Sequence, residues 1–188
     1  MKKIFLFVLM ILACFSLTAC EKDYTKGKHY VEISVKDYGK IKLELDADVA
    51  PITVANFMKL VNQKFYDGTN FHRIIYGFMI QGGAPKEGDE PETIIGEFSA
   101  NGHKNDILHK RGVISMARAN DMNSASSQFF IVHQDSPHLN GSYAAFGHVV
   151  SGMNVVDKLA QVQTIAGTDG IVAETNRPVI EYIREVEK

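Results

Sequence analysis

Residues Phe71 to Gly83, read FHRIIYGFMIQGG, are the stretch that decides the fold. Two short apolar runs flank a Tyr76-Gly77 pair, and this pattern predicts a β-hairpin. Because side chains two apart in a strand share a face, we expect Phe71, Arg73 and Ile75 to project together. Arg73 is a cation in an otherwise apolar run, which makes it a candidate functional residue.

The second run places Met79 and Gln81 on one face. If the two strands are neighbours, that face carries Arg73, Met79 and Gln81 beside Phe78. The pattern then predicts a shallow apolar pocket with one fixed cation and one amide. The alternative is an ordinary core hairpin, in which the arginine lies at the rim with its aliphatic stem on apolar surface.

The chain starts with a pattern typical of export. Lys2 and Lys3 precede an apolar run from Ile4 to Leu17, and small residues follow up to Cys20. The run is shorter than the ~20 residues that a spanning helix needs. We therefore predict a secretory signal peptide over residues 1–19.

The ending Leu17-Thr18-Ala19-Cys20 resembles the lipobox of bacterial lipoproteins. The resemblance implies palmitate-type acylation of Cys20, which becomes the first mature residue, a polar tether over residues 20–28 and an extracytoplasmic protein anchored to the cell membrane or outer membrane. The alternative is an ordinary signal peptide that is cleaved elsewhere. The other cysteine, Cys14, leaves with the signal, so no disulfide is expected.

The remainder, residues 29–188, is long enough for one complete core, so we predict a single domain. The formal net charge is −2, and lysines and arginines do not cluster. This composition argues against nucleic acid as a partner. We expect a monomer.

Short strands with two helices are predicted along this domain. Pro51 opens a helix in which Val54, Phe57, Met58 and Val61 form one apolar stripe. A second helix is predicted over residues 153–162. Beside the hairpin, alternating or β-branched runs predict strands at 29–35, 41–45, 112–117, 128–132, 144–150 and 178–186.

The motif FHRII-GFMIQGG, followed in order by GVISMA and SQFFI, resembles the cyclophilin family of peptidyl-prolyl isomerases. The resemblance implies a mainly β fold, a closed antiparallel eight-stranded β-barrel capped by two α-helices. It also implies an enzyme that accelerates X-Pro isomerisation in exported or envelope proteins and so assists their folding. Its partners would be proline-containing peptide segments, and no cofactor is implied.

The resemblance also assigns roles to residues. The catalytic set would be Arg73, Gln81 and Phe78. The remaining residues at matching positions would bind the substrate: His72, Met79, Ala117, Arg118, Ala119, Gln128, Phe130, Leu139 and Tyr143. His138 stands where well-known eukaryotic members carry tryptophan, and this departure implies weak cyclosporin binding.

A membrane-tethered module or holdase chaperone that grips proline segments with little turnover is the alternative function. Arg73 and Gln81 favour the enzyme, because apolar gripping alone requires no fixed cation. Seven histidines raise the possibility of a metal site, but no His-x-His or His-Glu-x-x-His occurs, so no metal is expected.

Overall fold

The structure is a computed structural model that describes residues 22–86 and 91–188. The predicted signal peptide and the predicted lipidation site at Cys20 lie outside the described residues. Within the described part of the chain, no helix combines the length and hydropathy needed to cross a membrane.

The described residues form eight strands and two α-helices, together with three short 3-10 helices. The helices are α1 (Pro51–Asn62) and α2 (Met153–Leu159). The strands are β1 (Lys28–Val35), β2 (Gly39–Asp46), β3 (Phe71–Ile75), β4 (Met79–Gly82), β5 (Val113–Met116), β6 (Phe129–Val132), β7 (Ala145–Ser151) and β8 (Ile180–Glu185).

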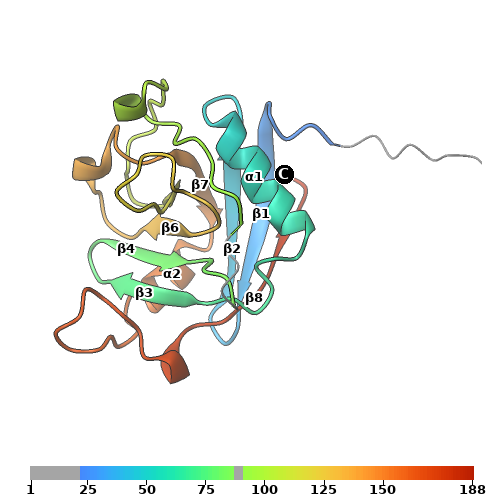
Figure 1. The fold of residues 1–188 in the computed structure, drawn as a ribbon. Helices are drawn as coiled ribbons and strands as arrows, with labels where there is room; N and C mark the ends of the chain where they lie inside the picture. Colours follow the sequence, from blue (N-terminus) through green and yellow to red (C-terminus); the bar gives the residue numbers. More distant parts are fainter. Residues whose placement is uncertain (1–21, 87–90) are drawn as a thin grey trace, which may run out of the picture.

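The strands form one antiparallel sheet in the order β3-β4-β6-β5-β7-β2-β1-β8, curled around the main core (Figure 1). Helix α1 packs against β2 and β8, and α2 packs against β2. The predicted mainly β architecture with two helices is confirmed. The predicted closure of the barrel is wrong, because β3 and β8 are the two edges of an open sheet.

The sheet stays open because another segment takes the outer edge of β3. The amide of Ile74 donates to the carbonyl of Gly170 at 2.7 Å, and the amide of Val172 donates to the carbonyl of His72 at 2.9 Å. The starts of β3 and β8 meet only through the isolated bridge of Asn70 with Val179 and through backbone hydrogen bonds between residues 68–71 and 178–180. With its edge filled, β3 cannot form a regular ladder with β8.

Helix α1 buries the predicted apolar stripe, and its N-terminus is capped from a distant segment. Ala50 at the N-cap has no side chain that could cap the helix. The buried carboxylate of Glu97 instead accepts hydrogen bonds from the amides of Ile52 (3.1 Å) and Thr53 (2.7 Å). These bonds satisfy donors that the first turn of a helix leaves free.

Strands β4, β5 and β6 carry apolar side chains on both faces, with Gln81 and Ser115 as the polar exceptions. One face belongs to the main core, and the other carries a second apolar cluster on the outside of the curved sheet. Along β4 and β6 alternate residues divide between them, with Ile80, Phe129 and Ile131 inside and Met79, Phe130 and Val132 outside. The outer cluster therefore forms an apolar platform on which a binding site can be built.

A β-bulge near the start of β3 sets which side chains reach this platform. Phe71 pairs with Gly82 and Arg73 pairs with Gln81, so β3 has one extra residue between the two pairs. Phe71 consequently lies in the main core, whereas Ile75 packs on the outer cluster. The prediction that Phe71 shares a face with Arg73 is wrong for this reason.

Candidate functional site

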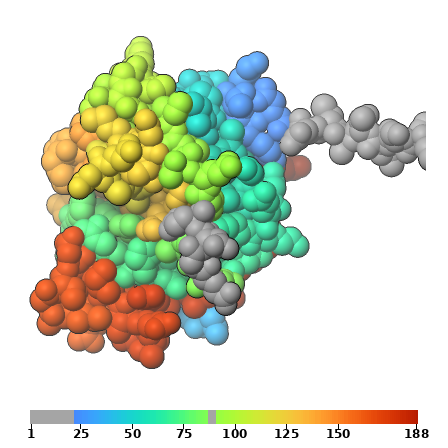
Figure 2. Space-filling model, in the orientation of Figure 1, coloured from blue at the N-terminus to red at the C-terminus, as the bar shows by residue number. Residues whose placement is uncertain are grey.

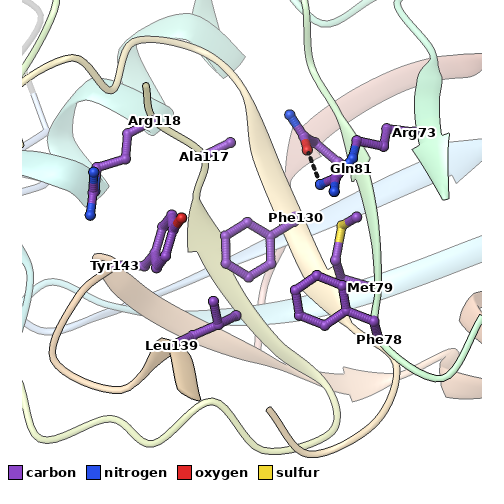
Figure 3. Close-up of a pocket in the computed structure, with 9 residues that line it drawn as sticks. All are labelled: Arg73, Phe78, Met79, Gln81, Ala117, Arg118, Phe130, Leu139 and Tyr143. Atoms are coloured by element: carbon purple, nitrogen blue, oxygen red, sulfur yellow. Dashed lines mark hydrogen bonds between the residues drawn. The ribbon is translucent and has the colours of Figure 1, made fainter. Parts of the chain in front are cut away.

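A cavity of about 180 Å³ opens over the outer cluster (Figure 3). Side chains from β3, β4 and β6 converge on it, together with side chains from the β3–β4, β5–β6 and β6–β7 connections. Every residue of its lining was predicted from the sequence: Arg73, Phe78, Met79, Gln81, Ala117, Arg118, Phe130, Leu139 and Tyr143.

Arg73 and Gln81 lie directly opposite each other on β3 and β4. Arg73 Nη1 donates to Gln81 Oε1 at 3.2 Å, and Gln81 Nε2 donates to Gln128 Oε1 at 3.0 Å. The pairing of the two strands therefore brings the arginine and the glutamine into contact. It holds a permanent cation at the edge of the cavity.

The floor of the cavity is apolar, and its side chains are almost fully buried. Met79, Phe130 and Leu139 are 2%, 5% and 7% exposed. The Tyr143 ring meets the Phe130 ring edge-on, with centroids 5.8 Å apart. Phe78 is half-buried, and its ring lies 5.3 Å from that of His138. A small apolar ring could bind here beside the guanidinium.

Arg118 forms a fixed wall of the cavity. Its guanidinium lies 4.7 Å from the centroid of the Tyr143 ring, and Nε and Nη2 both donate to the carbonyl of Ser142. A neighbouring cavity of about 370 Å³ shares Gln81, Ala117 and Arg118 with the first. The predicted residues Ala119 and Gln128 line this second cavity rather than the first.

His72 lines neither of these two cavities, although the sequence placed it among the substrate-binding residues. Burial lowers the pKa of its imidazole, and the charges of Arg177 and Arg73 lower the pKa further. Both effects favour the neutral form of the ring. The bulge in β3 directs Arg73 to the cavity instead.

The predicted peptide edge at Ala117 to Ala119 has two of its amides already bonded within the chain. Ala117 donates to the carbonyl of Gln128 at 2.9 Å, and Ala119 donates to Ser124 Oγ at 2.9 Å. A peptide at this edge would need other backbone groups, such as carbonyl oxygens.

Two residues near the site were not foreseen. His109 is buried with its ring stacked 6.0 Å from that of Phe130, and it contacts Ser115 Oγ through Nε2 at 3.0 Å. Asp169 forms an ion pair with Arg73 Nη2. Both lie in irregular segments without apolar periodicity, so no sequence pattern pointed to them.

The site suits binding and conformational chemistry more than covalent chemistry. It combines a fixed donor with an apolar floor, and its nine lining residues include no serine, cysteine or histidine that could act as a nucleophile. Among the described residues no group of three or more histidine, cysteine, aspartate or glutamate side chains could hold a metal ion.

Comparisons with known proteins identify the family of the chain. The family model described as cyclophilin type peptidyl-prolyl cis-trans isomerase/CLD matches residues 30–184. Peptidyl-prolyl cis-trans isomerase A of Dickeya dadantii is 40% identical over 159 residues, 82% of this chain and 83% of the relative. Peptidyl-prolyl cis-trans isomerase B of Bacillus subtilis is 45% identical over 129 residues, 67% of this chain and 87% of the relative.

Solved structures show the same fold. A cyclophilin type peptidyl-prolyl cis-trans isomerase of Cryptosporidium parvum superimposes with a TM-score of 0.75 at 27% identity, covering 86% of this chain and 99% of the other. A structure of that protein in the presence of the dipeptide Ala-Pro gives a TM-score of 0.74 at 28% identity, over 85% and 99% of the two chains. The chain therefore belongs to the cyclophilin-type peptidyl-prolyl cis-trans isomerase family and is an enzyme of that class.

Proposed function

We propose that the chain isomerises X-Pro bonds of exported or envelope proteins at the cavity around Arg73, as a monomer held to a membrane through Cys20. The observation that carries the site assignment is the pairing of Arg73 with Gln81 beside the apolar floor of Met79 and Phe130. The prolyl ring would occupy that floor. The related structure solved in the presence of Ala-Pro supports a proline-containing peptide as the ligand.

The chemistry of X-Pro rotation explains why these residue types suit the reaction. Amide resonance gives rotation a barrier of ~18–20 kcal/mol, and spontaneous exchange takes tens to hundreds of seconds. In the twisted transition state the lone pair is localised on the imide nitrogen and can accept a hydrogen bond. The Arg73 guanidinium would donate that bond to the transition state and not to the planar ground state.

The size of this effect implies that Arg73 would act together with the pocket and not alone. A hydrogen bond from a charged donor contributes roughly 1.5–3 kcal/mol, which corresponds to about ten- to a hundredfold in rate. The remaining rate enhancement would come from holding the prolyl ring on the buried surface of Met79, Phe130 and Leu139, which excludes water and fixes the ring. Only the flanking peptide then turns.

The membrane context rests on the sequence. Lys2, Lys3, the apolar run and the Leu-Thr-Ala-Cys ending support export followed by acylation at Cys20. Two or three acyl chains make a stable anchor where one is marginal. The substrates would then be the proline-containing segments of unfolded proteins outside the cytoplasm.

The test compares the substitution of two different arginines in the full chain, which is kept soluble in a non-ionic detergent. We expect Arg73→Ala to lower kcat/KM for an Ala-Pro peptide by about ten- to a hundredfold, because the charged donor is lost. Exchange spectroscopy of the two peptide isomers measures the rate. Arg111→Ala is the matched control, because Arg111 pairs with Asp157 and lines neither cavity.

Full activity in Arg73→Ala at unchanged thermal stability would contradict the role of Arg73. If the unaltered chain binds proline peptides at this site without accelerating exchange, the alternative function, a binding module or holdase, replaces the proposed isomerase activity of the cavity.

A further inference from the structure

Arg73 is held from two sides, and only one of them belongs to the hairpin. Gln81 contacts Nη1 from β4. From the other side, the main-chain carbonyl of Asp169 accepts a hydrogen bond from Nε at 2.9 Å, and its carboxylate Oδ2 accepts one from Nη2. Arg73 thus has one partner next to it in the sheet and another that lies 96 residues along the chain.

These contacts fix the whole guanidinium plane. The group has five N–H donors, and three of them are engaged by Asp169 and Gln81. Bonds on all three nitrogens prevent rotation about the terminal torsions. Each terminal nitrogen keeps one N–H outside these bonds, so the charged donor still has hydrogen available for a peptide in the cavity.

Asp169 reaches Arg73 from an anchored turn. Its neighbour Gly170 accepts the hydrogen bond from Ile74, and Ile171 forms an isolated bridge with Arg73. Thr168 Oγ1 accepts a hydrogen bond from the amide of Ile171 at 3.1 Å, which closes the turn on itself. Figure 2 shows this segment, in orange-red, lying against the green surface of β3. The backbone therefore fixes Asp169 even though its side chain is 79% exposed.

Asp169 contacts Arg73 without blocking the cavity. Asp169 is not among the residues that line the cavity. It contacts Arg73 from the outer edge of β3, where the segment 170–172 is paired. A carboxylate at that edge can orient the guanidinium without occupying the place of the prolyl ring.

We infer that Asp169 is a positioning residue for the isomerisation, which together with Gln81 holds the Arg73 guanidinium in the orientation that donates to the twisted imide nitrogen. This inference rests on the role proposed for Arg73. A free arginine side chain samples many rotamers, and a donor is most effective when it is oriented before the reaction. Asp169 removes that freedom in the unliganded enzyme.

The experiment measures kcat and KM separately for an Ala-Pro peptide with the full chain in detergent. We expect Asp169→Ala to lower kcat by about three- to tenfold, the size of one lost hydrogen bond, with KM changed less than twofold. Asp169→Asn keeps an acceptor for Nη2 and should recover at least half of the lost kcat. The matched control is Asp106→Ala, which removes a carboxylate that is also ion-paired and almost equally exposed, at 77%.

A double variant shows whether Asp169 acts through Arg73. In an Arg73→Ala background, adding Asp169→Ala should change kcat by less than twofold. An equal loss in both backgrounds would overturn the inference, as would unchanged kcat in Asp169→Ala or a gain in kcat/KM, which would make Asp169 a competitor of the substrate. If Asp169→Ala keeps its activity while Arg73→Ala loses it, only the inference about Asp169 fails and the proposed function stands. If Arg73→Ala keeps full activity, the proposed role of Arg73 itself is wrong.

Discussion

At the scale of single residues, we expect His109 to make the stability of the fold depend on pH. Its ring stacks 6.0 Å from that of Phe130, and burial lowers the pKa of the imidazole. Nδ1 lies 3.2 Å from Asn140 Oδ1 and Nε2 lies 3.0 Å from Ser115 Oγ. The neutral ring satisfies both contacts when Nδ1 donates to the amide oxygen and Nε2 accepts from the hydroxyl.

The sign of the pH effect follows from this lowered pKa. The unfolded chain takes up a proton on His109 near pH 6.5, while the folded chain resists it until a lower pH. Because the unfolded state then binds more protons, the free energy of unfolding should fall as the pH drops below about 6.5 and stay level above about 7.5. Urea unfolding at several pH values measures this slope.

The matched pair for that measurement is a buried and an exposed histidine. We expect His109→Gln to reduce the slope between pH 6.5 and 5, whereas His148→Gln, at an exposed position, should keep it. His72 has a lowered pKa as well and leaves some slope in either variant. An identical slope in His109→Gln and the unaltered chain would show that His109 is not the titrating group.

Residues of the site differ in how far the sequence predicts them. Arg73 and Gln81 belong to one hairpin, so strand periodicity brings them together without further knowledge. Phe130 needed the family resemblance, because periodicity alone does not say which face of a doubly apolar strand carries a pocket. Asp169 could not be foreseen, since its contact joins irregular chain to a strand far away in sequence.

At the scale of elements, the pairing of β3 with residues 170–172 depends on one glycine. Gly170 has φ +76°, and a Cβ there would lie 2.5 Å from the carbonyl oxygen of Ile74. The alanine of Gly170→Ala would have both a left-handed backbone and a steric clash with β3. We expect the clash to lower the free energy of unfolding by about 1–3 kcal/mol beyond the backbone cost, because the segment must move off the strand. Hydrogen exchange at the amides of Ile74 and Val172 should increase.

Gly167 is the matched control for that substitution. It has nearly the same backbone conformation, φ +79°, but a Cβ there meets nothing within 4 Å. Gly167→Ala should therefore show only the left-handed backbone cost of about 1–2 kcal/mol. Equal destabilisation and equal hydrogen exchange in the two variants would mean that the close approach at Gly170 is unimportant.

The edge of β3 also explains why the strands and helices were easier to predict than whether the sheet closes into a barrel. Apolar alternation is local, and the predicted strands and helices were found with ends shifted by a few residues, such as α2, which ends at Leu159. Whether β3 pairs with β8 or with residues 170–172 is a competition between distant segments. Local patterns do not decide such competitions.

At the scale of the whole molecule, the described chain begins close to the proposed anchor. Lys22 forms an ion pair with Glu185 in β8, and Tyr24 donates to the same carboxylate at 3.0 Å while its ring packs on the core. An extended chain spans at most about 3.6 Å per residue. An acylated Cys20 would therefore keep this end of the domain within roughly 10 Å of the bilayer.

The two cysteines provide the test of that anchor. We expect the full chain, expressed in a bacterial host, to incorporate labelled palmitate, and the mature protein to begin at Cys20 with the added mass of two or three acyl chains. Cys20→Ser should abolish the label, because no acceptor thiol remains at the cleavage site. Cys14→Ser, which alters the other cysteine of the same predicted signal, should keep both label and mass. Label retained in Cys20→Ser, or a mature protein that begins elsewhere without acyl mass, would replace the lipoprotein by an ordinary exported isomerase that is free to diffuse to its substrates.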